Sequence, residues 1–230
     1  MAFLRTADLR RAVSEVEEMG FGAIWVGESL AREAFAASAI ILAATNQIKV
    51  ATGAYLDEME KAPYRAPEPD PPAPIVLAAL GPKMLQLARE RTAGAHPYFV
   101  PIEHTRQARG ILGPDRLLAP EHAVVFAKTR EAARGPGDTY MRTYLALPNY
   151  RNNLVRLGWS DEELTPPGSD RLFDAMVAWG DDEAIAAKLR RHQEAGADQI
   201  AISVLTPTPD RAPTTELRGL APLLLDPGLR

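Results

Sequence analysis

The sequence of 230 residues contains no cysteine, so disulfide bonds, thiolate catalysis and cysteine-based metal sites are excluded. Its four histidines lack the spacing of a zinc motif, and we expect no metal site. No apolar run is long enough to span a bilayer, and the N-terminus lacks the hydrophobic region of a signal peptide. We therefore expect a soluble, cytoplasmic protein that makes no membrane contact.

Charge and motif content exclude further classes. The formal net charge is -4, with acidic and basic residues interspersed, so no basic patch for nucleic acid is expected. The G-x-G-x-x-G, G-x-S-x-G and G-K-[ST] motifs are absent, which argues against a Rossmann dehydrogenase, an α/β hydrolase and a P-loop NTPase. The length is sufficient for a substantial core, and we expect a single domain over residues 1–230.

The segment Ile75–Val100 predicts one βαβ unit. Residues 75–80 are apolar throughout, as in a strand of a parallel sheet that is buried on both faces. Gly81-Pro82 then begins a helix, because proline suits the first helical position. Gly94 ends that helix, and residues 96–100 are expected to form the next strand.

The same order of helix, glycine and strand recurs at residues 18–27 and 194–204, which favours an α/β layer fold. The other expected strands cover residues 48–51 and 123–127, and the other expected helices cover residues 6–19, 33–45, 103–112, 139–147, 148–157, 169–179, 182–195 and 216–225, with a turn at 135–138. Five or six strands suit a (β/α) barrel or a doubly wound sheet. A complete barrel needs eight strands and about 250 residues.

Six segments read in this order resemble the luciferase-like flavin-barrel family, and in particular its branch of oxidoreductases that use the deazaflavin coenzyme F420. These segments are residues 22–28, 42–53, 80–84, 94–99, 148–154 and 194–198. The resemblance implies a (β/α)8 barrel with the cofactor across the C-terminal ends of the strands. It also implies hydride transfer with F420, or with FMN as the alternative, and oxygen activation by a monooxygenase when the cofactor is reduced FMN.

The sequence departs from the family at two places. Residues 1–5 leave little room for the usual first strand, and Gly53 joins Ala54 without the usual helix and fourth strand between them. We therefore expect a TIM-barrel-like α/β fold that is truncated relative to eight strands. An open barrel edge must be covered by a helix or paired across a dimer, so a homodimer is expected.

The resemblance implies a cofactor site at two strand ends. The segment Gly81-Pro82-Lys83-Met84 is expected to hold a phosphate at a helix N-terminus, through backbone N–H groups of the helix start and the Lys83 ammonium group. The structural alternative is an ordinary turn with a solvated lysine. Thr52 and Gly53 end another strand, where the family often has a strained bulge against the flavin face.

The resemblance implies one acid–base group and a small-molecule substrate pocket. Glu28 ends a strand and is expected to act as an acid or base, unless it only caps a helix. Tyr150, Arg151 and Asn152 are expected to line the pocket, unless they form the polar face of an amphipathic helix. A structural role is expected for the segment His96–Tyr98, because it opens a strand at the stability face of a barrel.

The predicted function is thus an F420-dependent or FMN-dependent oxidoreductase that moves a hydride to or from an organic substrate. The alternative is a degenerate, non-catalytic protein of the same fold that binds flavin or serves in assembly. A third interpretation is a fragment that lacks a segment, with exposed barrel edges.

Overall fold

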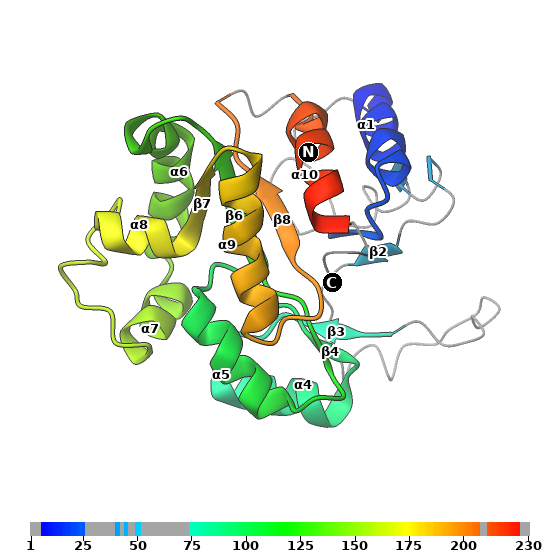
Figure 1. Cartoon of the computed structure of the whole chain (residues 1–230). Helices are drawn as coiled ribbons and strands as arrows, with labels where there is room; N and C mark the ends of the chain where they lie inside the picture. Colours follow the sequence, from blue (N-terminus) through cyan, green and yellow to red (C-terminus); the bar gives the residue numbers. More distant parts are fainter. Residues whose placement is uncertain are drawn as a thin grey trace.

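Helices surround three small parallel sheets in this protein (Figure 1). The computed structural model describes residues 6–25, 40–41, 44–45, 49–51, 74–207 and 211–225. The helices are α1 (Thr6–Glu18), α4 (Pro82–Arg91), α5 (Ile102–Leu112), α6 (Arg130–Leu145), α7 (Pro148–Arg156), α8 (Asp170–Met176), α9 (Asp182–Glu194) and α10 (Thr214–Leu225). The strands are β1 (Ala23–Trp25), β2 (Lys49–Ala51), β3 (Val76–Leu77), β4 (Gly94–Ala95), β5 (Leu117–Leu118), β6 (Glu121–Phe126), β7 (Val177–Gly180) and β8 (Ala201–Val204).

All strand pairs are parallel, as expected for an α/β fold. The sheets have the orders β1-β2, β3-β4-β5 and β7-β6-β8. The second and third sheets are joined, because the Glu121 N–H donates to the Pro97 carbonyl oxygen at 2.8 Å and the Ala201 N–H donates to the Pro120 carbonyl oxygen at 2.9 Å. Within the described ranges the strand pairing does not close into one eight-stranded barrel.

The predicted βαβ unit is confirmed as β3, α4 and β4. Gly81 is the N-cap residue of α4 with extended backbone (φ -89°, ψ 161°), and Pro82 occupies the first turn, where its missing N–H costs no hydrogen bond. The paired strands meet in register, with Val76 opposite Gly94. A side chain at Gly94 has no space, because an added Cβ atom would lie 2.0 Å from the Leu117 carbonyl oxygen on β5.

Four helices agree closely with the sequence prediction, namely α1, α5, α7 and α9. Helix α9 is capped by Asp181, whose carboxylate accepts a hydrogen bond from the Ala184 N–H at 2.9 Å. Such a cap satisfies one of the N–H groups that a helix start leaves without a partner. None of the described helices is long and apolar enough to cross a membrane.

The predicted turn at residues 135–138 is wrong. Helix α6 begins at Arg130 and runs through Pro136, although an internal proline removes one helical hydrogen bond. The Thr129 hydroxyl caps the helix by accepting from the Ala132 N–H at 3.2 Å. Gly137 is required by packing, because an added Cβ atom would lie 2.4 Å from the Phe173 ring. Tertiary contacts and a good cap therefore override the local turn signal.

Two further predictions are corrected, one of a helix and one of a strand. The expected helix over residues 169–179 ends at Met176, and the next four residues form β7, which pairs with β6. The expected strand at residues 96–100 is displaced, because β4 covers Gly94–Ala95 and the segment His96–Tyr98 follows its C-terminal end. These residues therefore follow the C-terminal end of a parallel strand, whereas the sequence predicted that they open one.

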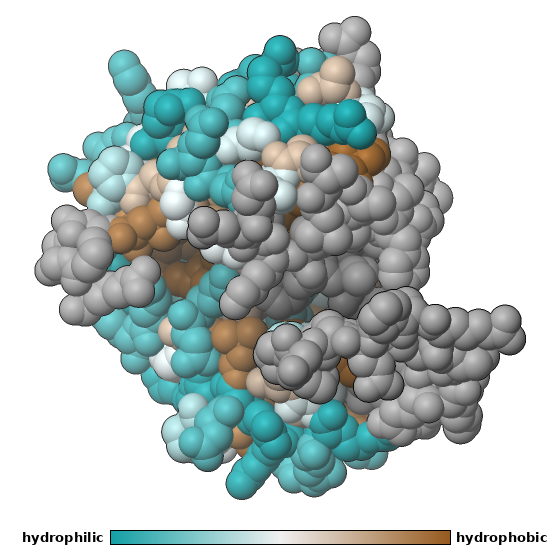
Figure 2. All heavy atoms as spheres, turned by 90° about the vertical axis from the view of Figure 1, so that its right-hand side faces the viewer, coloured by the Kyte–Doolittle hydropathy of each residue, from teal (hydrophilic) through white to brown (hydrophobic). Residues whose placement is uncertain are grey.

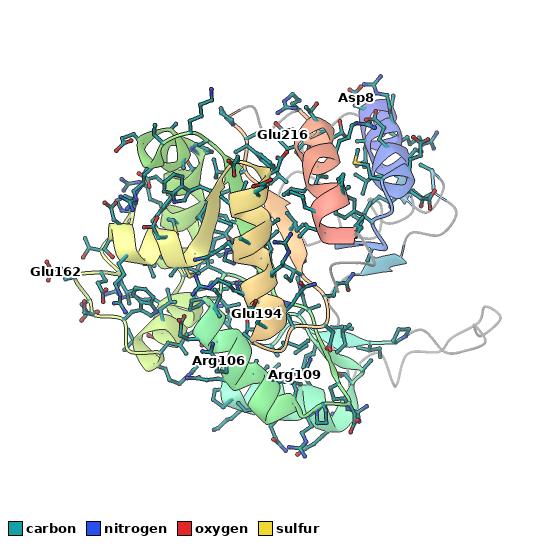
Figure 3. The ribbon with its side chains drawn as sticks, in the orientation of Figure 1. Asp8, Arg106, Arg109, Glu162, Glu194 and Glu216 are labelled. Carbon is teal, nitrogen blue, oxygen red and sulfur yellow. The ribbon has the colours of Figure 1, made fainter. Side chains whose placement is uncertain are left out.

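Arg109 on α5 joins three parts of the chain (Figure 3). Its Nε donates to the Gly196 carbonyl oxygen at 2.8 Å, and its Nη1 donates to the Arg116 carbonyl oxygen at 2.8 Å. Its Nη2 pairs with Asp198, which also accepts a hydrogen bond from the Leu118 N–H at 2.7 Å. The guanidinium group thus fixes α5 against β5 and the turn between α9 and β8.

Candidate functional site

A cavity of about 1580 Å³ opens between α1, β1, β8, α6 and α10. This volume is larger than the roughly 300–1,000 Å³ of ordinary small-ligand pockets. Tyr98, Tyr140, Tyr144 and Ser203 are among the residues that line it. Figure 2 shows hydrophobic side chains in a recess of the face that lies on the right of Figure 1.

A buried carboxyl group lies directly behind this wall. Glu121, at the start of β6, is 3% exposed. Its Oε2 atom accepts hydrogen bonds from the Tyr140 hydroxyl at 2.8 Å and from the Phe99 N–H at 3.3 Å. The Tyr98 and Ser203 hydroxyl groups also approach the carboxyl group, but Oε1 has no hydrogen bond of normal geometry.

Burial raises the pKa of Glu121 to about 7, while the hydrogen bonds from Tyr140, the Phe99 N–H, Ser203 and Tyr98 lower it in part. Burial also raises the pKa of Tyr98 and Tyr140 well above the ordinary value of tyrosine, so both phenols stay protonated. The carboxyl group is therefore the member of this cluster that changes charge near neutral pH.

Aromatic rings pack around the carboxyl group. Phe99 stacks on Tyr144 with ring centroids 4.9 Å apart, and Tyr150 meets Tyr144 edge to face at 5.0 Å. Phe99 has a φ of 53°, a conformation that side-chain-bearing residues rarely adopt and that tends to occur at functional sites. This backbone turn follows β4 and directs the Phe99 N–H to Glu121.

Replacing Glu121 by glutamine should stabilise the protein in alkaline solution. The pKa of this carboxyl group is raised, so wild type loses stability as the pH rises from the unfolded-state value of 4.5 to about 7. The loss amounts to roughly 3 kcal/mol above pH 7, and the glutamine variant does not suffer it. Urea unfolding at pH 5 and pH 8.5 measures this difference. Equal effects of the substitution at both pH values would contradict the assignment.

The predicted phosphate site lies at the N-terminus of α4, after β3. Lys83 and Met84 are exposed in its first turn, and Gly81 has no side chain to occupy the site. The Arg156 guanidinium group of α7 lies beside Gly81, since an added Cβ atom there would be 3.7 Å from Nη1. Arg156 donates to Oδ1 of the buried Asn153, whose Nδ2 has no hydrogen-bond partner. A helix N-terminus and two cations are chemically suited to a phosphate.

The residues predicted for substrate binding separate in the structure. Tyr150 is half-buried in the aromatic cluster, and burial raises its pKa to about 12. Arg151 binds the Asp161 carboxylate at 2.5 Å and the Leu164 carbonyl oxygen at 3.1 Å, so it holds the loop after α7. Asn152 is exposed. Three further predicted site residues, Glu28, Thr52 and Gly53, lie outside the described residues.

A second buried polar group lies on the opposite face of β6. Successive residues of a strand point to opposite faces, so His122 points away from the Glu121 cluster and meets His192 of α9, with ring centroids 4.6 Å apart. The His192 Nδ1 is 2.9 Å from the Thr105 hydroxyl, while Nε2 of both histidines has no partner. Burial lowers the pKa of both, that of His192 to about 3. No group of potential metal ligands forms in the described part of the chain.

Three residues of the candidate site were not predicted from the sequence, namely Glu121, Arg156 and Asn153. For Glu121 a signal exists, because it is a charged residue between Pro120 and His122, two positions before the apolar run 123–126. A carboxylate at the start of a fully buried strand needs hydrogen-bond partners. Arg156 and Asn153 lie in the polar helix α7 without any local signal, since only tertiary packing brings them to Gly81.

Neither a known family profile nor a curated protein sequence matches this chain. Solved structures do match it. An F420-dependent secondary alcohol dehydrogenase in complex with an F420-acetone adduct aligns over 99% of this chain and 96% of its own, with a TM-score of 0.69 and 11% identity. The coenzyme F420-dependent tetrahydromethanopterin reductase of Methanopyrus kandleri aligns over 94% of each chain, with a TM-score of 0.69 and 12% identity.

An FMN-bound structure is also similar. The oxygenating constituent of 3,6-diketocamphane monooxygenase from Pseudomonas putida aligns over 95% of this chain and 92% of its own, with a TM-score of 0.66 and 14% identity. The expected α/β fold is thus confirmed, and the neighbours depend on the two cofactors that the sequence resemblance implies. This chain shares the fold of F420-dependent and FMN-dependent oxidoreductases.

Proposed function

We propose that this protein is a luciferase-like oxidoreductase that moves a hydride to or from an organic substrate with F420, or with FMN as the alternative. The observation that carries the proposal is the fold shared with F420-dependent and FMN-dependent enzymes over at least 94% of the chain. A deazaflavin or flavin supplies the hydride chemistry when bound, and the protein supplies binding, orientation and electrostatics.

The described residues fit such a cofactor. The α4 N-terminus at Gly81, with Lys83 and Arg156, would hold its phosphate, and Asn153 would orient the Arg156 guanidinium group through its Oδ1 atom. The cavity lined in part by Tyr98 and Tyr144 would take the ring system and the substrate. Glu28 remains the proposed acid or base, and Thr52 and Gly53 remain proposed contacts to the cofactor.

The first experiment is equilibrium binding of F420 and of FMN to the full chain, followed by cofactor fluorescence. Replacing Lys83 or Arg156 by glutamine should weaken binding about tenfold each, because each change removes one charge-assisted contact to a phosphate. Arg89→Gln is the matched control, since it removes the same charge from the other end of α4. Equal effects of all three substitutions would overturn the phosphate site.

The same measurement separates the two functional classes. Binding of one cofactor followed by its reduction or oxidation with a substrate supports the enzyme. Binding without turnover supports the degenerate flavin-binding alternative.

We also propose a cytoplasmic homodimer in which open sheet edges are covered, and sedimentation of the purified protein tests its oligomeric state.

A further inference from the structure

The Glu121 cluster is joined to the cavity by hydroxyl groups. We propose that Glu121 and Tyr98 form a proton-transfer site for a ligand in the cavity that carries a hydroxyl or carbonyl group. The inference rests on the proposed function, in which F420 or FMN gives or takes the hydride. It adds a second acid–base group, distinct from Glu28.

The hydrogen-bond geometry leaves one carboxylate oxygen available. Oε2 of Glu121 is occupied by the Tyr140 hydroxyl and the Phe99 N–H, whereas Oε1 is buried without a partner. A buried acceptor that is left unpaired costs free energy, so it is retained in proteins mainly where it has a use. Oε1 is thus the atom of this cluster that can take up or release a proton without breaking an existing hydrogen bond.

Residues with side-chain hydroxyl groups lie between the cavity and the Oε1 atom of Glu121. Tyr98, Tyr140 and Ser203 line the cavity, while the carboxyl group lies behind them. Tyr140 donates its single proton to Oε2. The Tyr98 hydroxyl faces the carboxyl group from the segment after β4 and also interacts with the Tyr144 hydroxyl. Tyr98 can therefore pass a proton between the cavity and Glu121.

Among the described residues, the groups that face Glu121 are uncharged. Tyr98 approaches from the end of β4, Tyr140 and Tyr144 from α6, and Ser203 from β8. Because burial and these neutral donors set its pKa at about 7, both protonation states are populated at neutral pH. A general acid or base is most effective when its pKa lies near the working pH.

The proposed step moves one proton from the ligand to Tyr98 and one proton from Tyr98 to Glu121. The O–H bond of the ligand breaks and its proton passes to the Tyr98 oxygen, while the Tyr98 proton passes to Oε1 of ionised Glu121. The electron pair stays on the ligand oxygen, where it can form the carbonyl double bond as hydride would pass from the adjacent carbon to oxidised F420 or FMN, the redox partner of the proposed function. In the opposite direction, protonated Glu121 returns the proton to the oxygen of a carbonyl group that is being reduced.

The first test is independent of any cofactor. Infrared spectra of the full chain are recorded from pH 5 to pH 9, in the region of the C=O stretch of a protonated carboxyl group. We expect a band that titrates near pH 7 and is lost in Glu121→Gln. Tyr98→Phe should keep the band but move its midpoint upward by about one pH unit, because the nearby Tyr98 hydroxyl, which favours the charged carboxylate, is lost. Glu162→Gln, at the periphery in Figure 3, is the control and should leave the band unchanged.

The second test measures protons exchanged when F420 or FMN binds. Calorimetric titrations at pH 7 in buffers of different ionisation enthalpy should detect proton exchange in wild type but not in Glu121→Gln. Absence of the infrared band, or equal exchange in both proteins, would overturn the inference. If the band is present but neither cofactor binds, the proposed function fails, while the proton-holding role of Glu121 stands.

Discussion

Replacing His122 by leucine is expected to make the protein more resistant to acid. Burial keeps the pKa of His122 and His192 far below the ordinary 6.5, so the folded state keeps both rings neutral while the unfolded chain binds protons below pH 6.5. Stability is therefore complete above about pH 6.5 and is lost as the pH falls, at about 1.4 kcal/mol per pH unit for each ring. The leucine variant should gain roughly 2 kcal/mol relative to wild type between pH 7 and pH 5.

The measurement is urea unfolding of wild type and variant at intervals from pH 8 to pH 4. A direct comparison is needed because Glu121 acts in the opposite sense over part of this range, and its contribution cancels between the two proteins. His122→Gln is the matched control, since it removes the titrating ring without adding apolar surface. Both variants should lose the same pH dependence. Unfolding free energies that decline in parallel for all three proteins would refute the explanation.

Replacing Gly94 by alanine should destabilise the protein by about 3 kcal/mol or more. β4 lies between β3 and β5, and the added methyl group would lie 2.0 Å from the Leu117 carbonyl oxygen and 2.6 Å from the Leu117 Cβ atom. Backbone atoms of a paired strand cannot move aside as a flexible side chain can, so the sheet must separate locally.

Gly110→Ala is the control for this prediction. Gly110 lies within α5, and an added Cβ atom there meets nothing within 4 Å. Alanine in a helix interior is better than glycine by up to about 1 kcal/mol, so this variant should be slightly more stable. Thermal unfolding of the two variants should therefore shift in opposite directions. A Gly94→Ala protein as stable as wild type would show that the two strands are not packed as described.

Local patterns in the sequence predicted most of the helices and the central βαβ unit. A Gly-Pro turn, an apolar stripe and a capping aspartate act through neighbouring residues, so α4 and α9 can be recognised without knowing the rest of the molecule. The failures have a common cause. Helix α6 continues through Pro136 because Gly137 packs against Phe173, and β7 forms because it pairs with β6. Both features depend on contacts between distant segments.

The candidate site was predictable only in part. The glycine and lysine of the α4 N-terminus were found because they lie at a recognisable turn, whereas Arg156 and Asn153 reach it from another helix. Glu121 was missed because its importance comes from the tyrosines around it. Tyr98 and Tyr140 come from the end of β4 and from α6, and no sequence spacing relates them to the carboxyl group.

The ion pair between Arg109 and Asp198 cannot form until the ribosome has made both residues. Asp198 lies 89 residues beyond Arg109 along the chain. At roughly 5–20 residues per second, a ribosome needs about 4–18 seconds to make that stretch. At the end of this interval the nascent chain contains β3 to β7, while the guanidinium group has lacked its carboxylate and β6 still lacks its neighbour β8. The growing polypeptide thus exposes unpaired strand edges for seconds, which is the period when binding by a chaperone has the greatest effect on its yield.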